Sequence, residues 1–244
     1  MWPLSAWAQQ AVVPVIGWLG SGLPDATNAD RMRAFHQSLS ESGFVEGRNV
    51  TIEYRWANDQ YDRLPALAAD LVHRQVAVIL ASSGPSARAA KAATTTIPIV
   101  FTVAFDPVEV GLVASLNRPG GNLTGATNLS VELGPKLLET LHEFTPTANI
   151  VAALINPDNP TSEIISRDFQ MAARSLGLQL HVLNTSTDRD IETAFASLAQ
   201  LRAGALVIGV DPFFNRRLEQ LAALALRHAV PGSANIVSLP RLAV

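Results

Sequence analysis

From Pro14 onward, the chain alternates short apolar runs with longer amphipathic segments. Residues 76–81 are a continuous apolar run, which is typical of a strand buried on both faces of a parallel sheet. By contrast, Met32, Phe35 and Leu39 have the spacing that places apolar side chains on one face of a helix. Strands that alternate with helices in this way predict parallel β-α-β units with right-handed crossovers.

This alternation occurs twice along the chain. In the first half we expect strands at residues 15–19, 50–55, 76–81, 97–102 and 123–129, and helices at residues 32–39, 64–72, 83–91, 108–116 and 135–144. In the second half we expect strands at residues 150–155, 178–183 and 205–210, and helices at residues 162–176, 190–201 and 216–227. The sequence therefore predicts an α/β protein of two doubly wound parallel-sheet lobes, residues 13–127 and 128–244.

The composition narrows the class of protein. With 244 residues, 48% of them hydrophobic and 16% charged, the chain can bury a sizeable core, which disfavours a disordered or coiled-coil protein. The formal net charge of -3 and the scattered Lys and Arg residues give no electrostatic footprint for nucleic acid. The lack of cysteine excludes disulfides, thiolate zinc sites and a lipid-modified N-terminal cysteine. No apolar run is long enough to span a bilayer.

The first twelve residues have a pattern of their own. Ala6, Trp7 and Ala8 form an A-x-A sequence that suits cleavage by signal peptidase before Gln9, although a basic n-region and a full apolar h-region are missing. Residues 1–12 are therefore either the remnant of a signal peptide or a flexible tail.

Polar residues follow the ends of the predicted strands, where ligands bind in open parallel sheets. Backbone amides in the turn 83–86 suit a carboxylate, and Asp106 or Asp211 suits an ammonium group. Such groups together fix a small zwitterion or polyol. The candidate ligand-binding residues are Trp18, Ser83, Ser86, Asp106, Asn128, Asn156, Asn159 and Asp211.

Several of these residues also have a purely structural interpretation. Ser86 suits the N-cap of the following helix, and Asp211 followed by Pro212 suits an N-cap and first helical residue. Residues 156–160 have the composition of a turn, and Trp18 suits the hydrophobic core. Both interpretations stay open at this stage.

The sequence offers little support for catalysis or for a cofactor. The five histidines are dispersed without metal-ligand spacing, and neither a G-x-S-x-G nucleophile elbow nor a Walker phosphate loop occurs. Residues 17–22 contain glycines after the first strand, but in the order G-x-x-G-x-G, which does not match the dinucleotide-binding fingerprint. We expect no cofactor and no metal.

Six blocks of sequence, in the same order along the chain, resemble one family of ABC-transporter substrate-binding proteins. These blocks are residues 43–50 (GFVEGRNV), 53–57 (EYRWA), 61–65 (YDRLP), 97–102 (IPIVFT), 106–108 (DPV) and 116–125 (LNRPGGNLTG). The family has a type I periplasmic-binding fold, and its better-understood relatives bind tryptophan, tyrosine or similar amino acids. The resemblance extends from about residue 13 to residue 230 and is specific for the family but not for the ligand.

The resemblance implies two lobes joined by a hinge, which close on a small solute held between them. It places Ser83 and Ser86 at the ligand carboxylate, Asp211 at the ligand amino group, and Trp18, Asp106, Asn128, Asn156 and Asn159 on pocket-lining loops. It further implies a monomeric, periplasmic protein that delivers its solute to an ABC transporter permease. Family members continue beyond Pro231 with further strands and helices, so residues 232–244 look like an atypical tail and the second lobe looks incomplete.

Three other functions remain as alternatives. One is an α/β enzyme of unknown reaction, such as an oxidoreductase or a hydrolase. Another is a sensory domain of the same fold, although nothing before Val13 has the pattern of a helix-turn-helix. The last is a truncated relative of the binding proteins that no longer works.

Overall fold

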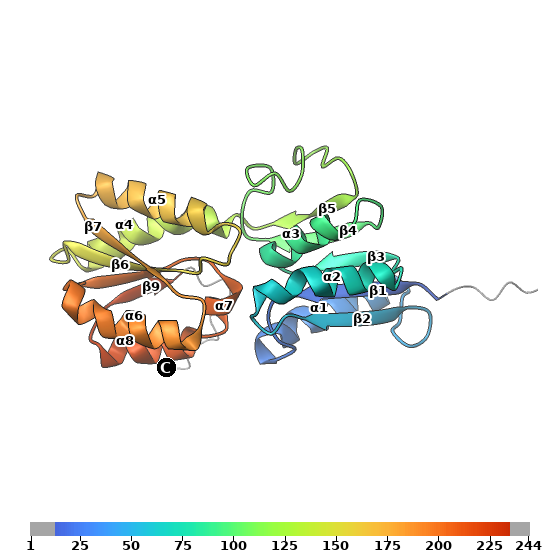
Figure 1. Cartoon of the computed structure of the whole chain (residues 1–244), viewed down its shortest axis with the longest axis horizontal. Coiled ribbons are helices and arrows are strands. Elements are labelled where there is room, and N and C mark those ends of the chain that lie inside the picture. The colour runs from blue at the N-terminus through green and yellow to red at the C-terminus, as the bar shows by residue number, and fades with distance from the viewer. Residues whose placement is uncertain (1–12, 235–244) are drawn as a thin grey trace, which may run out of the picture.

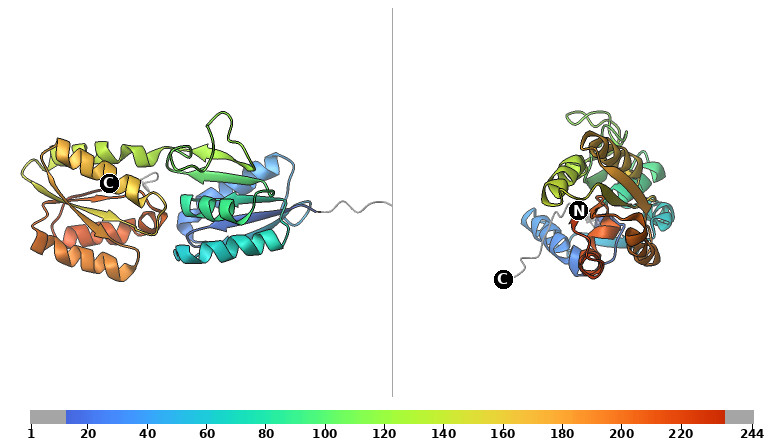
Figure 2. Two further views of the ribbon diagram at one scale, coloured as in Figure 1. Left: turned by 45° about the horizontal axis from the view of Figure 1, so that its top comes forward. Right: turned by 90° about the vertical axis from the view of Figure 1, so that its left-hand side faces the viewer.

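The computed structural model describes residues 13–234, which form two lobes built on separate all-parallel sheets (Figure 1). The strands of the first sheet are β1 (Val15–Gly20), β2 (Thr51–Trp56), β3 (Val78–Ala81), β4 (Ile99–Val103) and β5 (Leu123–Thr127), in the order β2-β1-β3-β4-β5. The helices of this lobe are α1 (Ala26–Glu41), α2 (Leu64–His73) and α3 (Gly84–Ala93). Right-handed crossovers place α1 on one face of the sheet and α2 and α3 on the other (Figure 2).

The second sheet repeats this arrangement. Its strands are β6 (Ile150–Ile155), β7 (Gln179–Asn184), β8 (Ala205–Ile208) and β9 (Gly232–Ala234), in the order β7-β6-β8-β9. The helices of this lobe are α4 (Gly134–Phe144), α5 (Ser162–Ser175), α6 (Asp188–Leu201), α7 (Pro212–Asn215) and α8 (Leu218–Arg227). The predicted fold class of two parallel-sheet α/β lobes is confirmed.

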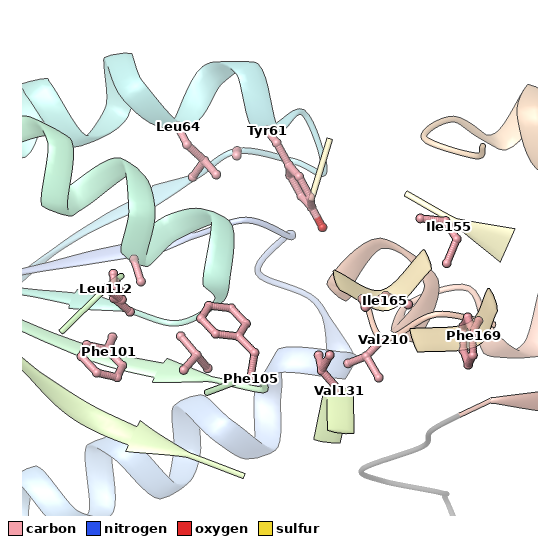
Figure 3. Packing of buried hydrophobic residues seen from close by; sticks show 14 of the residues in the cluster. Tyr61, Leu64, Phe101, Phe105, Leu112, Val131, Ile155, Ile165, Phe169 and Val210 are labelled. Atoms are coloured by element: carbon pink, nitrogen blue, oxygen red, sulfur yellow. The ribbon is translucent and has the colours of Figure 1, made fainter. Parts of the chain in front are cut away.

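Burial explains why the central strands are apolar throughout. All four residues of β8 and five of the six residues of β6 are buried, because helices cover both faces of the sheet. One cluster of buried side chains runs through both lobes, and Figure 3 shows Phe105, Val131 and Val210 of this cluster lying between the two sheets. The packing of apolar side chains therefore continues across the junction of the lobes.

Within residues 13–234, the chain passes from the first lobe to the second at residues 128–133. This segment is held by its own side chains: Asn128 Oδ1 accepts hydrogen bonds from the Ser130 backbone and hydroxyl, at 3.2 and 2.7 Å. Leu129 has a φ of 52°, in the left-handed region, and a short 3-10 turn follows at Ser130–Leu133. The connection between the lobes is thus short and is held by local hydrogen bonds.

One predicted helix is absent from the structure. The helix predicted at residues 108–116 is wrong, because this segment forms turns around Gly111, whose φ of 66° is left-handed and ends a right-handed helix. The backbone amides of Leu112 and Val113 donate instead to the Pro107 carbonyl, at 2.7 and 3.1 Å. Residues 232–234, at the start of the segment expected to be an atypical tail, form strand β9, which pairs with β8. Residues 1–12, the predicted signal-peptide remnant, and residues 235–244 lie outside the described part of the chain.

None of the helices between residues 13 and 234 has both the length and the apolar character needed to cross a membrane. The same part of the chain contains no group of three or more His, Cys, Asp or Glu side chains placed to hold a metal ion.

Candidate functional site between the lobes

A cavity of about 530 Å³ lies between the two lobes, and both lobes line it. Its walls come from the carboxyl ends of the strands, the loops that follow them and the first turns of the adjoining helices. The lining residues are Ser21, Gly22, Asn28, Asp30, Arg31, Trp56, Ser82, Ser83, Gly84, Pro85, Thr102, Val103, Ala104, Phe105, Asn128 and Val131 from the first lobe and the connection, and Asn159, Thr161, Val210, Pro212, Asn215, Arg216 and Leu218 from the second lobe.

The N-terminus of α3 forms one wall of the cavity. Ser83 is the N-cap of this helix: its Oγ accepts a hydrogen bond from the Ser86 amide at 3.3 Å and lies 2.8 Å from Ser86 Oγ. Gly84 follows, and its missing side chain leaves room for the ring of Phe105, because a Cβ there would lie 2.5 Å from Phe105 Cε1. The positive end of the helix dipole and the apolar face of Phe105 therefore meet at this wall.

Three of the eight candidate residues line the cavity, namely Ser83, Asn128 and Asn159. They come from the ends of β3, β5 and β6, so strands distant in sequence bring them together. Asn159 is held firmly, since its Oδ1 accepts from the Thr161 amide and hydroxyl at 3.0 and 2.8 Å. The structure thus supports the expectation that amides and hydroxyls after the strand ends face one cleft.

The other candidates do not line the cavity. Trp18 is 1% exposed and packs against Phe35 with ring centroids 5.2 Å apart, which supports the alternative that it belongs to the core. Ser86 is fully buried beneath Ser83, and Asp106 Oδ1 accepts from the Val108 amide at 2.7 Å to hold its own turn. Asn156 is buried and donates to Asp211.

Asp211 is buried at the lobe boundary and is surrounded by hydrogen-bond donors. Its Oδ1 accepts from Tyr61 Oη and Asn156 Nδ2, both at 3.1 Å, and from the Phe213 amide at 2.7 Å, while its Oδ2 accepts from Asn159 Nδ2 at 2.5 Å. The Phe213 bond makes Asp211 the N-cap of α7, as the Asp-Pro pair indicated. With both oxygens occupied, Asp211 is placed behind the cavity wall rather than in it.

Burial dominates the electrostatics of this carboxyl group. Loss of solvation raises the pKa of Asp211 to about 6, and the hydrogen bonds from Asn159, Asn156, Phe213 and Tyr61 oppose this increase. The pKa of Tyr61 is raised well above its usual value, first by burial and then by the nearby Asp211 carboxylate. Tyr61 therefore remains a neutral hydroxyl that donates across the lobe boundary.

Sequence reasoning missed several residues at this site. Trp56 and Phe105 give the cavity its aromatic surface, and Arg31 and Arg216 bring positive charge to it. Trp56 is the last residue of β2 and Phe105 lies two residues beyond β4, so the rule that selected polar residues after strands would have found both if aromatic residues had been included. Arg216 is the first residue of the helix predicted at residues 216–227, whereas in the structure it lies between α7 and α8.

Two parallel α/β lobes that enclose a cavity at the carboxyl ends of their strands have the fold of type I periplasmic-binding proteins. The sequence model of the family described as "ABC transporter substrate binding protein" matches residues 25–232. The chain belongs to this family. The match ends at the first residue of β9.

Individual relatives agree with this assignment. The chain is 32% identical over 167 residues to a tyrosine-binding protein of Clostridioides difficile, an alignment that covers 68% of this chain and 48% of the relative. The chain thus spans about half the length of this curated relative.

Solved structures show the same fold. A conserved domain protein from Vibrio cholerae has a TM-score of 0.80 and is 24% identical in sequence. The match covers 91% of this chain and 74% of the Vibrio cholerae chain. An ABC domain from Streptococcus pneumonia in complex with L-Trp has a TM-score of 0.77 and 18% identity, with 91% and 73% covered. A ligand-free, open substrate binding protein from Clostridium difficile has a TM-score of 0.56 and 27% identity, with 91% and 74% covered.

Proposed function

We propose that the chain is the solute-binding component of an ABC importer and captures a small, amino-acid-like solute between its lobes. The observation that carries this proposal is the cavity of about 530 Å³ whose walls come from both lobes. A solute that contacts both walls favours the closed arrangement of the lobes, which is how ligand binding becomes a conformational signal. Family membership supports the same function.

The chemistry of the walls suits a zwitterion with an apolar side chain. The N-terminus of α3 offers its positive dipole to a carboxylate. Trp56, Phe105 and Val210 offer an apolar surface, while Asn128 and Asn159 add amide groups. The relatives named for tyrosine and solved with L-Trp bind solutes of this class, which supports extending it to this chain.

In this proposal, Ser83, Asn128 and Asn159 contact the solute. Trp18, Ser86, Asp106, Asn156 and Asp211 support the walls from behind, because their polar atoms or rings are buried or already paired. The protein binds its solute without transforming it, acts as a monomer in the periplasm, and passes the solute to a membrane permease.

Thermal melting with added solutes tests the proposal. Amino acids, aromatic acids, sugars and nucleosides are added one at a time, and the solute is recovered afterwards to check that it is chemically unchanged. A ligand at one hundred times its dissociation constant stabilises the native state by about 2.7 kcal/mol, which raises the melting temperature measurably. A chain that melts identically with every solute, or that transforms the solute it binds, contradicts the proposal. The identical melts are also the result expected of a non-functional relative.

A matched pair of variants locates the binding site. Thr102 lines the cavity from β4, and Thr124 is an exposed residue of the neighbouring strand β5 outside it. Thr102→Tyr fills the cavity and should abolish the ligand-induced shift without lowering the melting temperature of the free chain. Thr124→Tyr adds the same ring elsewhere and should leave the shift intact.

A further inference from the structure

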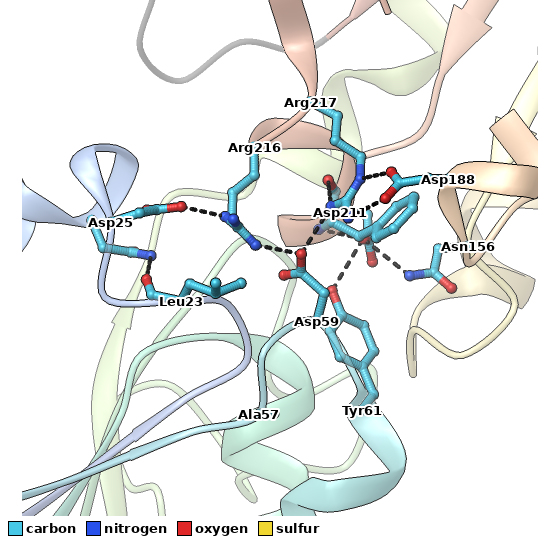
Figure 4. A network of polar contacts seen from close by, with 12 residues as sticks. Leu23, Asp25, Ala57, Asp59, Tyr61, Asn156, Asp188, Asp211, Arg216 and Arg217 are labelled. Carbon is cyan, nitrogen blue, oxygen red and sulfur yellow. Dashed lines mark hydrogen bonds and ion pairs between the residues drawn. The ribbon is translucent and has the colours of Figure 1, made fainter. Parts of the chain in front are cut away.

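A network of charged side chains joins the two lobes beside the cavity (Figure 4). From the second lobe, Arg216 Nε donates to Asp25 Oδ2 at 2.7 Å and Arg216 also donates to Asp59, while Arg217 donates to Asp59 Oδ2 at 2.8 Å. Tyr61 of the first lobe donates to Asp211 of the second at 3.1 Å. We call Asp25, Asp59, Tyr61, Asp211, Arg216 and Arg217 the interlobe latch.

The first lobe holds its half of the latch in position. Asn58 and Asp59 both have left-handed φ angles, 56° and 62°, in the loop after β2. The Asn58 amide donates to the Gly22 carbonyl at 3.0 Å, and the Asp59 amide donates to the Ser21 carbonyl at 2.8 Å. Asn and Asp adopt this conformation more readily than other non-glycine residues, and the two backbone hydrogen bonds fix it so that the Asp59 carboxylate meets the other lobe.

The second lobe holds the opposite half just as firmly. Arg217 lies 3.8 Å above the ring of Phe213, donates to the Phe213 carbonyl at 3.1 Å, and also donates to Asp188 Oδ1 at 2.5 Å. Arg216 and Arg217 lie at the junction of α7 and α8, and Asp211 fixes the start of α7 as its N-cap. The two guanidinium groups are therefore pre-positioned to meet Asp59.

The latch is partly shielded from solvent, but it is not fully paired. The Asp59 side chain is 8% exposed and that of Arg216 is 17% exposed, so solvent screens their interaction weakly. The Oδ1 atoms of Asp25 and Asp59 are buried without a hydrogen-bond partner among residues 13–234. Desolvating these oxygens opposes closure, while the ion pairs favour it. Both contributions exist only when the two lobes are in contact, so their sum affects how strongly the closed arrangement is favoured.

We infer that the interlobe latch sets the balance between open and closed lobes in the solute-free chain, with Asp59 as its central residue. Asp59, Arg217 and Tyr61 act on solute affinity by positioning the lobes and need no contact with the solute. The inference rests on the proposed function for the idea that the lobes separate. The effect of the latch on the separation of the lobes is measured without any solute.

The experiment follows lobe separation directly. The chain has no cysteine, so Ala92→Cys on α3 and Ser175→Cys on α5, both exposed, take spin labels one on each lobe. Double electron–electron resonance then gives the distance distribution of the solute-free chain. Asp59→Asn keeps the size of the side chain but removes the charge shared by two arginines, and we expect about a tenfold shift of the ratio towards the open population.

Glu109→Gln is the matched control. Glu109 also pairs across the lobes, with Arg167 at 3.2 Å, but both side chains are about half exposed, so its removal should leave the distance distribution unchanged. Arg216→Gln should increase the open population as Asp59→Asn does. The double variant should increase it by less than the sum of the two single effects, because both substitutions remove the same ion pair between Arg216 and Asp59.

The outcomes are distinguishable from those of the melting panel. If Asp59→Asn gives the same distances as the unmutated chain and Glu109→Gln, the latch does not control closure, whatever the panel shows. If Asp59→Asn loses its helical circular dichroism signal, the variant has not folded, and Arg216→Lys replaces it in the experiment. Lysine keeps the positive charge of Arg216 but cannot bridge the Asp25 and Asp59 carboxylates as the guanidinium group does. An unchanged distribution in that variant overturns the inference as well.

Discussion

Replacing Gly84 by alanine puts a methyl group where α3 meets the cavity wall. The new Cβ would lie 2.5 Å from Cε1 and 3.2 Å from Cζ of Phe105, closer than carbon atoms pack. Phe105 is only 7% exposed, so its ring has little free space except on the side of the cavity, which it lines. The ring must therefore move into the volume proposed for the solute.

The magnitude follows from two opposing effects. Overpacking of a buried site typically costs about 1–3 kcal/mol. The preference for alanine over glycine, roughly 0.5–1 kcal/mol in the middle of a helix, offsets less than this at Gly84 because Gly84 is the first residue of α3. A net loss of about 1–2 kcal/mol remains. For a chain of this size, each kcal/mol lowers the melting temperature by roughly 2–4 °C.

Gly134→Ala is a close control because Gly134 also begins a helix, precedes a proline and faces a phenylalanine ring. Its Cβ would lie 3.1 Å from Phe169 Cε1, a contact that a shift of a few tenths of an ångström relieves. Differential scanning calorimetry of both variants, with and without a solute identified in the panel, separates the effects. Gly84→Ala should melt lower and bind the solute more weakly, whereas Gly134→Ala should do neither. If the two variants melt and bind alike, the argument from Phe105 is refuted.

Two further predictions concern single buried groups. Ser83→Ala should destabilise the chain by about 1–2 kcal/mol in chemical denaturation, since it removes the cap of α3 and leaves the buried Ser86 hydroxyl without its partner, whereas Ser86→Ala keeps the cap and should cost less. For Asp211, the folded pKa of about 6 exceeds the ordinary value of 3.8, so its contribution to stability is full below pH 3.8 and is lost as the pH rises to 6. The free energy of unfolding of the unmutated chain, relative to Asp211→Asn at each pH, should fall by about 3 kcal/mol across that window and stay level above it. A difference that does not vary between pH 4 and pH 7 would show that Asp211 titrates normally.

The fold was predictable because it follows from local patterns. Residues 150–155 and 64–72 show their strand and helix periodicities within a few positions, and the structure has β6 and α2 there. The predicted helix at 108–116 failed because an amphipathic pattern does not reveal that Gly111 takes a left-handed φ. Periodicity thus gives the elements, but a single backbone angle decides whether a short one forms.

The candidate site was predictable only in part. Choosing polar residues that follow predicted strands identifies residues near the cavity, but it does not predict the direction in which each side chain points. Ser83, Asn128 and Asn159 line the cavity, but Trp18 lies within β1, Ser86 lies within α3, and both are buried. For Asp211, the sequence did not reveal that Tyr61, 150 positions away, supplies one of the donors that surround the carboxylate. Pairings of this range depend on how two lobes meet, which no local pattern encodes.

The placement of each sheet within one stretch of chain has a consequence for biosynthesis. All strand pairings of the first sheet fall between residues 15 and 127, and those of the second fall between residues 150 and 234. A polypeptide leaves the ribosome N-terminus first, and domains fold as units during synthesis. The first sheet can therefore be complete before the second has fully emerged, and the contacts between the lobes form only after the second folding unit is in place.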